Sequence, residues 1–227
     1  MFNEVCGIDI MRKVFWAFVA VVIGFGVFNG WAAEEQTVTL AEVPAAVQKT
    51  IATEVDHAKA KLGEINRTTD DGEVSFEVQL TKPKEKRSVT IGVDGQILSR
   101  QVFLREMPEA ARKTVRAQAQ ALQGKLESVD LVMDAGTITY DATVTKGPRE
   151  ISFTVSEEGK LLAMEITINE APAAVQKTIR AKTAGCTVKS IEKNFQDEDG
   201  VTYDVEMSQD GKKVSFSVTD KGDVIAE

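Results

Sequence analysis

One short motif occurs three times in this sequence, and it constrains the fold more than any other feature. The copies begin Glu42-Val-Pro44, Glu106-Met-Pro108 and Glu170-Ala-Pro172, and each continues into a run that ends in Lys-Thr-Ile or Lys-Thr-Val. The three prolines are about 64 residues apart each time. A fixed period of this length is typical of a repeated structural unit. The sequence therefore predicts three successive units of similar fold.

The units are small and follow one another without a linker. Each holds roughly 60 residues, which is near the lower limit at which a hydrophobic core supports itself. We therefore expect neighbouring units to share buried surface. The segment Gln101-Val-Phe-Leu104 runs directly from a strand-like stretch into the second motif, with no Gly/Ser-rich spacer. This predicts a stiff array and leaves open that the sheets continue from edge to edge.

Each unit begins with a predicted helix. Proline suits the first helical turn, because its missing N–H would have no partner there. In the first unit, apolar residues recur in steps of three and four from Ala46 to Leu62, which favours one buried helical face. An acidic residue before each proline would complement the positive end of the helix dipole: Glu42, Glu106 and Glu170. One glycine per unit is predicted to end the helix: Gly63, Gly124 and Gly185.

Four runs with strand character follow each helix. The second alternates apolar and polar residues, as in Val74, Phe76, Val78 and Leu80, which is typical of an antiparallel strand with one covered face. Tight hairpin turns are predicted at Asp94-Gly95, Glu158-Gly159 and Lys221-Gly222. We therefore predict an α+β fold of three tandem repeats, each one helix followed by a four-stranded antiparallel β-meander packed on it. The predicted repeats are residues 39–102, 103–166 and 167–227.

The first 33 residues are predicted to be a signal peptide. Arg12 and Lys13 precede an apolar run from Val14 to Phe28, and small residues follow up to Ala33. Basic residues, an apolar centre and a small-residue exit describe a secretory signal. The apolar run is shorter than the ~20 residues that usually span a bilayer, although an uncleaved anchor is the alternative. Met11 begins a better signal than Met1, so the true start is hypothesised to lie there.

The charge balance argues against nucleic-acid binding. The chain has a net charge of −8, with 27 Lys and Arg against 35 Asp and Glu. A nucleic-acid binder needs a basic surface that displaces counterions from phosphates. One basic cluster, Lys82, Lys84, Lys86 and Arg87, lies between two strand-like runs. It is predicted to be a solvated hairpin loop, with an anionic ligand or a membrane contact as the alternative.

No residue pattern points to catalysis, a cofactor or a metal. The chain's single histidine, His57, lies within the first predicted helix and is expected to be exposed, with no base or nucleophile pattern around it. Cys186 is the one cysteine left after signal removal; we interpret it as a small buried hydrophobe, with intermolecular pairing left open. Asp197, Glu198 and Asp199 are the best calcium candidates, but they lack the spacing of a twelve-residue calcium loop. We therefore predict no catalytic, cofactor-binding or metal-binding residue.

Several of these features resemble a known family. The helix opening Leu40-x-Glu-x-Pro44, the Asp/Gly turns and the strand Tyr203-Asp-Val-Glu-Met207 are similar to PepSY-like domains, including the β-lactamase-inhibitor-like group. The third repeat is the best match, and the resemblance covers nearly all of the mature chain. It implies a secreted or periplasmic, non-catalytic domain that binds or inhibits other proteins such as peptidases.

The sequence thus leads us to expect an exported, non-catalytic binding protein, periplasmic or secreted, that inhibits or regulates a peptidase or another envelope protein. Its partner would be a protein or peptide, not a nucleic acid, and no stable membrane anchor would remain after signal cleavage. The polar face of the meanders is the candidate surface, because the helices occupy the other face. The alternative is a structural or envelope-maintenance protein without a specific enzyme target.

Overall fold

The computed structural model describes residues 34–226, apart from residues 71, 84, 198–199 and 210–211. The predicted signal peptide, residues 1–33, therefore lies outside the described residues. Each of the three helices follows a short 3-10 turn: η1 (Leu40–Glu42) and α1 (Ala45–Ala58), η2 (Leu104–Glu106) and α2 (Glu109–Leu122), η3 (Ile168–Glu170) and α3 (Ala173–Lys182). Among the described residues, no helix has the length and apolar character needed to cross a membrane.

Strands make up most of the described chain. They are β1 (Glu34–Val38), β2 (Lys61–Asp70), β3 (Glu73–Lys82), β4 (Glu85–Gly92), β5 (Ile97–Gln101), β6 (Lys125–Asp134), β7 (Thr137–Lys146), β8 (Arg149–Ser156), β9 (Leu161–Glu165), β10 (Thr187–Asp197), β11 (Gly200–Gln209), β12 (Lys212–Thr219) and β13 (Val224–Ala226). All 13 form one antiparallel sheet in chain order. The predicted fold class, α+β with three tandem repeats of one helix followed by a four-stranded antiparallel β-meander packed on it, is therefore wrong: the fold is mostly sheet, and its 13 strands form one continuous antiparallel sheet.

The strands predicted to close each unit explain this difference. β5 pairs with β4 on one side and with β6 on the other, and β9 likewise pairs with both β8 and β10. A strand has two hydrogen-bonding edges, and an edge left unpaired in the interior would cost free energy. The same short strand therefore ends one group of strands and begins the next, so the sheet has no break between them.

The sequence interpretation also missed β1, which precedes the first helix. β1 pairs with β2 so that Thr37 lies opposite Asn66. Gln101 of β5 lies opposite Asp130 of β6 in the same way, and Glu165 of β9 lies opposite Glu192 of β10. β1 therefore takes the place on β2 that β5 takes on β6, and it covers an edge that would otherwise be open.

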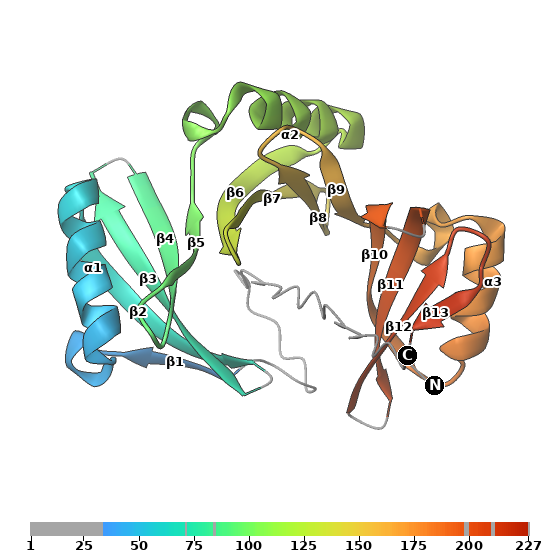
Figure 1. Cartoon of the computed structure of the whole chain (residues 1–227), viewed down its shortest axis with the longest axis horizontal. Helices are drawn as coiled ribbons and strands as arrows, with labels where there is room; N and C mark the ends of the chain where they lie inside the picture. Colours follow the sequence, from blue (N-terminus) through green and yellow to red (C-terminus); the bar gives the residue numbers. More distant parts are fainter. Residues whose placement is uncertain (1–33, 71, 84, 198–199, 210–211, 227) are drawn as a thin grey trace, which may run out of the picture.

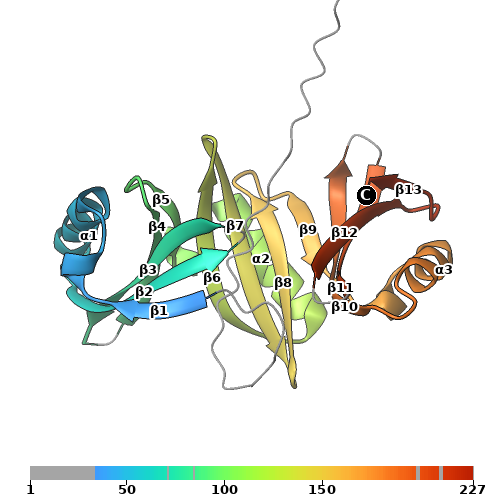
Figure 2. The same cartoon turned by 90° about the horizontal axis from the view of Figure 1, so that it is seen from below.

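The sheet bends into an arch with its helices outside. Figures 1 and 2 show α1, α2 and α3 along the outer face of the arch, each over a different part of the sheet. Successive side chains of a strand point to opposite faces, so every strand contributes one set of residues under the helices and another to the inner face. We call the inner surface the concave face.

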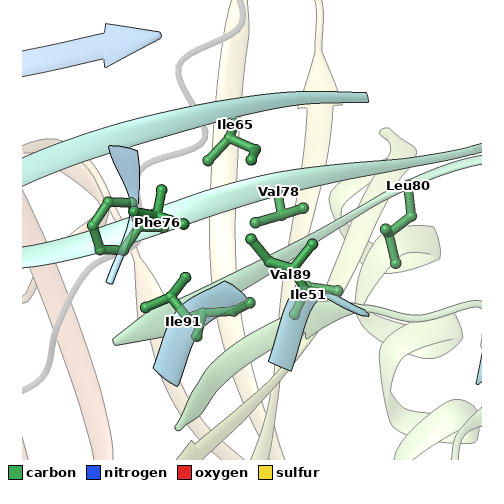
Figure 3. Packing of buried hydrophobic residues seen from close by; sticks show 9 residues of the cluster. Ile51, Ile65, Phe76, Val78, Leu80, Val89 and Ile91 are labelled. Carbon is green, nitrogen blue, oxygen red and sulfur yellow. The ribbon is translucent and has the colours of Figure 1, made fainter. Parts of the chain in front are cut away.

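Three hydrophobic clusters lie between the helices and the sheet. In the first, Val47 and Ile51 of α1 pack against strand residues such as Phe76 and Ile91, as Figure 3 shows for Ile51 and its neighbours. Val115 of α2 and Val175 of α3 occupy the corresponding places in the second and third clusters. Complete burial of such side chains stabilises a fold by about 1.5–3 kcal/mol each.

A glycine in each of the β4–β5, β8–β9 and β12–β13 turns lies against a helix. Gly159, in the turn between β8 and β9, has φ +83°, and a Cβ there would lie 2.7 Å from the backbone of Ala110. The Thr114 hydroxyl of α2 donates a hydrogen bond of 2.7 Å to the Gly159 carbonyl. The same bond joins Thr50 to Gly95 and Thr178 to Gly222. The predicted Asp-Gly, Glu-Gly and Lys-Gly turns are confirmed.

The predicted helix ends need correction. α1 and α2 end at left-handed Lys59 and Gln123, not at Gly63 and Gly124, because the helix gives way directly to the next strand. Glu42, Glu106 and Glu170 also have a role that the sequence did not suggest. They close the 3-10 turns, as where Glu170 accepts a backbone hydrogen bond of 2.6 Å from Thr167.

Candidate binding surface on the concave face

The middle strands place one carboxylate per unit on the concave face. In β3, β7 and β11, the apolar residues point to the helices and the residue between two of them points inward. Those inward residues are Glu77, Asp141 and Asp204. Because the side-chain period of a strand is two, the alternation seen in the sequence determines this placement.

Hydroxyl and amide groups on neighbouring strands hold two of these carboxylates. The Thr154 hydroxyl donates to Asp141 Oδ1 at 2.7 Å. Asp204 accepts from the Ser217 hydroxyl at 2.6 Å and from Asn194 Nδ2 at 2.9 Å. These bonds fix the carboxylates within the sheet surface, so their charges have a defined geometry.

Further carboxylates lie directly opposite these groups in the strand pairs. Asp130 of β6 is the cross-strand neighbour of Asp141, and Glu192 of β10 lies between Glu165 of β9 and Asp204 of β11. Side chains at directly opposite positions are about 5 Å apart at Cβ, and like charges there are unfavourable. We call the six residues the acidic band: Glu77, Asp130, Asp141, Glu165, Glu192 and Asp204.

Burial and mutual repulsion raise the pKa of carboxylates in the acidic band. Burial, and then the carboxylates around it, that of Asp204 most of all, raise the pKa of Glu192 to about 7. No positive group contributes to this pKa shift. Glu192 therefore changes charge near neutral pH, and its ionised form lacks a compensating cation.

The acidic band continues from the strands that pack on one helix to the strands that pack on the next. Burial raises the pKa of Asp130 to about 6, and the negative charges of Asp141 and Glu77 contribute to this shift. Glu77 is on β3, which β4 and β5 separate from β6 in the sheet. Asp141 in turn contributes to the raised pKa of Glu192 across β8 and β9. The carboxylates therefore act as one negative field along the arch.

This arrangement favours recognition of positive charge. Repelling carboxylates such as Glu192 and Asp130, on whose pKa no positive group acts, gain free energy when a basic group approaches, whereas the charge of Arg149 already offsets part of the repulsion at Glu165. Among the described residues, no three Asp, Glu, His or Cys side chains are grouped so that they could hold a metal ion.

Two residues considered above as candidates for catalysis or metal binding, His57 and Cys186, do not belong to the acidic band. His57 is exposed in the last turn of α1, as expected. Cys186 is only half-buried and packs against the third hydrophobic cluster. The calcium hypothesis concerned Asp197, Glu198 and Asp199; the last two lie outside the described residues, as does the side chain of the first.

The basic cluster is not a simple solvated loop. Lys84 lies outside the described residues, and Lys86 is exposed. Arg87, however, donates to Glu106 at 3.1 Å and stacks on the ring of Phe103 with its guanidinium carbon 4.3 Å from the centroid. The prediction was wrong for Arg87, because this side chain joins β4 to the next 3-10 turn.

Sequence reasoning missed the acidic band, although a signal was present. The second strand of each predicted unit carries an acidic residue at the same polar position, in Ser75-Phe-Glu77, Thr139-Tyr-Asp141 and Thr202-Tyr-Asp204. In a chain with 35 acidic residues, this repetition did not stand out from ordinary surface charge. The opposing residues on β6, β9 and β10 could be placed only once the pairing of strands was known.

A family model matches the chain over residues 23–98 and 138–226, and its description is "Putative beta-lactamase-inhibitor-like, PepSY-like". The chain belongs to this PepSY-like family. The two matched segments include Glu77 and Asp141, and also Glu192 and Asp204. The predicted resemblance is therefore confirmed.

Solved structures also share similarity with this PepSY-like chain. A DUF2874 family protein from Bacteroides ovatus is 17% identical, with a TM-score of 0.38 over 54% of this chain and 86% of that one. A protein from Bacteroides eggerthii, whose description is periplasmic, is 16% identical, with a TM-score of 0.40 over 54% of this chain and 87% of that one. No curated protein matches the sequence significantly.

Proposed function

We propose that this PepSY-like chain is an exported, non-catalytic protein that binds a basic segment of another protein on its concave face. The observation that carries the proposal is the acidic band on the face of the sheet opposite the three described helices. A periplasmic or secreted location is supported by the basic and apolar pattern of residues 12–33.

Charge complementarity identifies the kind of partner. Asp130 lies opposite Asp141 and Glu192 lies opposite Asp204, so each pair has Cβ atoms about 5 Å apart and presents two neighbouring carboxylates to Lys or Arg side chains of a partner. The Thr154 and Ser217 hydroxyls donate their protons to Asp141 and Asp204, and their oxygen atoms can accept further hydrogen bonds from a peptide. The arch would receive such a segment on its inner side, over the strands of more than one unit.

An inhibitory role is the narrower form of this proposal. The β-lactamase-inhibitor-like description of the family supports it. A bound protein would be inhibited if its basic segment lay beside its active site. An assay of peptidase and β-lactamase activity with the purified chain tests this part separately from binding.

A matched pair of double variants tests the binding surface. The Asp130→Asn, Glu192→Gln variant removes two charges from the acidic band, and the Glu54→Gln, Glu109→Gln variant removes two from α1 and α2 on the outer side. Decalysine is titrated by calorimetry at pH 8 and low salt, where the acidic band is ionised. We expect about ten-fold weaker binding for the first variant, or ~1.4 kcal/mol, and little change for the second.

Capture from an envelope extract then identifies a natural partner. The wild type and both double variants serve as baits, and a true partner is retained by the wild type and the outer-face variant but lost by the acidic-band variant. Equal decalysine affinity for both variants would refute the proposed surface. A chain that captures no partner at micromolar concentration would favour the structural or envelope-maintenance role.

A further inference from the structure

Two short strands connect the groups of strands that pack on successive helices, and each does so through three residue pairs. At the first junction, between β5 and β6, Gln101 lies opposite Asp130 at the end of the paired stretch. At the second junction, between β9 and β10, Glu165 lies opposite Glu192 at the same place. The two junctions share their register, so the residues at each position can be compared directly.

The second junction brings two carboxylates face to face. Directly opposite side chains of an antiparallel pair are about 5 Å apart at Cβ, and like charges there are unfavourable. At the first junction Gln101 is neutral, and its amide can donate a hydrogen bond to Asp130. Thr37 and Asn66 occupy the same places where β1 meets β2, and the Thr37 hydroxyl donates to Asn66 Oδ1 at 3.1 Å. Among these three equivalent places, the second junction alone pairs two acidic residues.

Glu192 has carboxylates on both sides. Glu165 faces it from β9, and Asp204 faces it from β11. Lys193 and Lys213 have other contacts: the first lies with its Nζ 4.7 Å from the centroid of the Phe195 ring, and the second pairs with Glu206 at 3.0 Å. Burial raises the pKa of Glu192 to about 7, and the charges of four carboxylates add to this shift: Asp204, Asp141, Glu206 and Glu165.

Glu165 lies in a similar environment. Burial raises its pKa, and the charge of Glu150 on β8 contributes to the rise. The charge of Arg149 and a backbone hydrogen bond from Ser152 act in the opposite direction. One proton between Glu165 and Glu192 allows the O–H of one carboxyl group to donate to the other, whereas two ionised groups repel each other across the junction.

The first junction also has contacts that the second lacks. The guanidinium carbons of Arg87 and Arg105 each lie 4.3 Å from the centroid of the Phe103 ring, and both arginines form ion pairs between β4 and η2. A ring between two cations adds attraction across this junction. In the corresponding turn η3, Thr167 and Asn169 take the places of Phe103 and Arg105. The second junction therefore depends more on its strand pairing than the first does.

We propose that the second junction is a proton-controlled hinge of the arch, closed while Glu165 and Glu192 share a proton and locally open when both are ionised. Opening lets β10–β13 and α3 move against the rest of the arch, whereas the first junction stays closed over the same pH range. This inference does not rest on the proposed binding of a basic segment, because it concerns the chain without a ligand.

Native-state hydrogen exchange measures opening at both junctions in one sample. The Ile166 N–H donates to the Ile191 carbonyl at 2.9 Å at the second junction, and the Val102 N–H donates to the Val129 carbonyl at 2.8 Å at the first. Protection factors correct for the intrinsic pH dependence of exchange and report local opening at each amide. Between about pH 5.5 and about pH 8, we expect the protection factor of Ile166 to fall about five-fold and that of Val102 to change less than about two-fold.

Two reciprocal substitutions test whether the carboxylate pair is the cause. Glu165→Gln gives the second junction the residue that the first has, so the protection of Ile166 should lose its pH dependence. Gln101→Glu gives the first junction a carboxylate pair, so the protection of Val102 should acquire a pH dependence of the same sign. Glu157→Gln, at an exposed turn position, is the control and should behave like the wild type.

A distance measurement tests the hinge motion itself. In a Cys186→Ser background, spin labels on Lys113→Cys and Lys177→Cys join α2 to α3 across the second junction, and labels on Lys49→Cys and Lys113→Cys join α1 to α2 across the first. Double electron–electron resonance should show a broader α2–α3 distance distribution at the higher pH and an unchanged α1–α2 distribution.

Three results would overturn the proposal. Equal falls in protection at Ile166 and Val102 would show that pH acts on the whole fold and not on one junction. A pH dependence at Ile166 that persists in Glu165→Gln would exclude the carboxylate pair as its cause. An α2–α3 distance distribution that does not change with pH would exclude the motion. None of these results bears on decalysine binding, so the hinge and the proposed function fail separately.

Discussion

At the scale of single residues, the three hairpin glycines that lie against a helix, Gly95, Gly159 and Gly222, contribute differently from hairpin glycines that contact nothing, such as Gly136. Gly159 has φ +83°, and a Cβ would lie 2.7 Å from the Ala110 backbone, whereas Gly136 has φ +84° with nothing within 4 Å of a Cβ. The two positions therefore share the backbone conformation but differ in space. An alanine substitution at Gly136 therefore measures the free-energy cost of a left-handed alanine alone, and one at Gly159 adds the cost of displacing the helix.

We expect Gly159→Ala to lower the free energy of unfolding by about 3 kcal/mol or more, because both the strain and the clash apply. Gly136→Ala should lose only about 1 kcal/mol, from strain alone. Urea denaturation of both variants and the wild type measures the difference. Equal losses would show that the helix does not press on the hairpin.

The acidic band makes a prediction about pH. The folded pKa of Glu192, about 7, is above its ordinary value of 4.5, so the folded state holds this proton more tightly than the unfolded state. The unfolding free energy therefore falls as pH rises from about 4.5 to 7. Glu192→Gln should stabilise the fold by about 2 kcal/mol at pH 8 and by almost nothing at pH 4.

Thermal and urea denaturation at the two pH values check this sign. Glu157→Gln, at an exposed turn position, is the control and should leave stability unchanged at both. A Glu192→Gln variant with the same stability as the wild type at pH 8 would contradict the repulsion inferred within the acidic band.

Single residues also show which structural details could be predicted from the sequence. Alternation in β3 predicts that Phe76 and Val78 are buried, and both are. Arg87 could not be predicted in the same way, because its partner Glu106 comes from a different unit and the sequence does not show which residues meet there. Lys59 and Gln123 likewise take a left-handed conformation usually associated with glycine.

At the scale of elements, β5 and β9 determine how the fold is joined. Each is only five residues long, yet each pairs on both sides and continues directly into a 3-10 turn. Ile97, the first residue of β5, packs on the first hydrophobic cluster, and Val102, the residue that follows β5, packs on the second. Backbone pairing and ion pairs both cross each junction, in addition to these apolar contacts.

Backbone pairing should dominate at the second junction. Ile166→Pro removes the hydrogen bond of 2.9 Å that the Ile166 N–H donates to the Ile191 carbonyl, and we expect a loss of about 3 kcal/mol. Arg149→Met removes the ion pair with Glu170 and should cost less than about 1 kcal/mol, because both side chains are partly exposed.

Ile166→Val keeps the N–H and most of the apolar contact, so it serves as the control for the proline variant. Denaturant unfolding of the three variants ranks the two kinds of contact. A larger loss for Arg149→Met than for Ile166→Pro would show that charge, not pairing, holds the junction.

The elements themselves could largely be read from the sequence, but their pairing could not. Helical periodicity and period-two alternation locate α1, β3 and β4, because these patterns record which face is covered. β1 has only five residues and no apolar alternation of its own. It becomes a strand because β2 presents an open edge to it, which is a tertiary cause.

At the scale of the whole molecule, the arch separates two surfaces with different chemistry. The outer side carries the helices and their clusters, and the inner side carries the acidic band. The sequence motif indicated repetition, but repetition alone allows either separate sheets or a shared one. Which of these forms depends on whether the closing strand offers its second edge to the next unit, and that is decided by long-range pairing.

The most direct test of binding at the concave face is a map of amide chemical-shift changes when the chain binds decalysine, or its natural partner once captured. We expect changes centred on the residues of the acidic band in β6, β7, β10 and β11, and their loss in the Asp130→Asn, Glu192→Gln variant. Changes centred on α1, α2 or α3 that persist in this variant would contradict it.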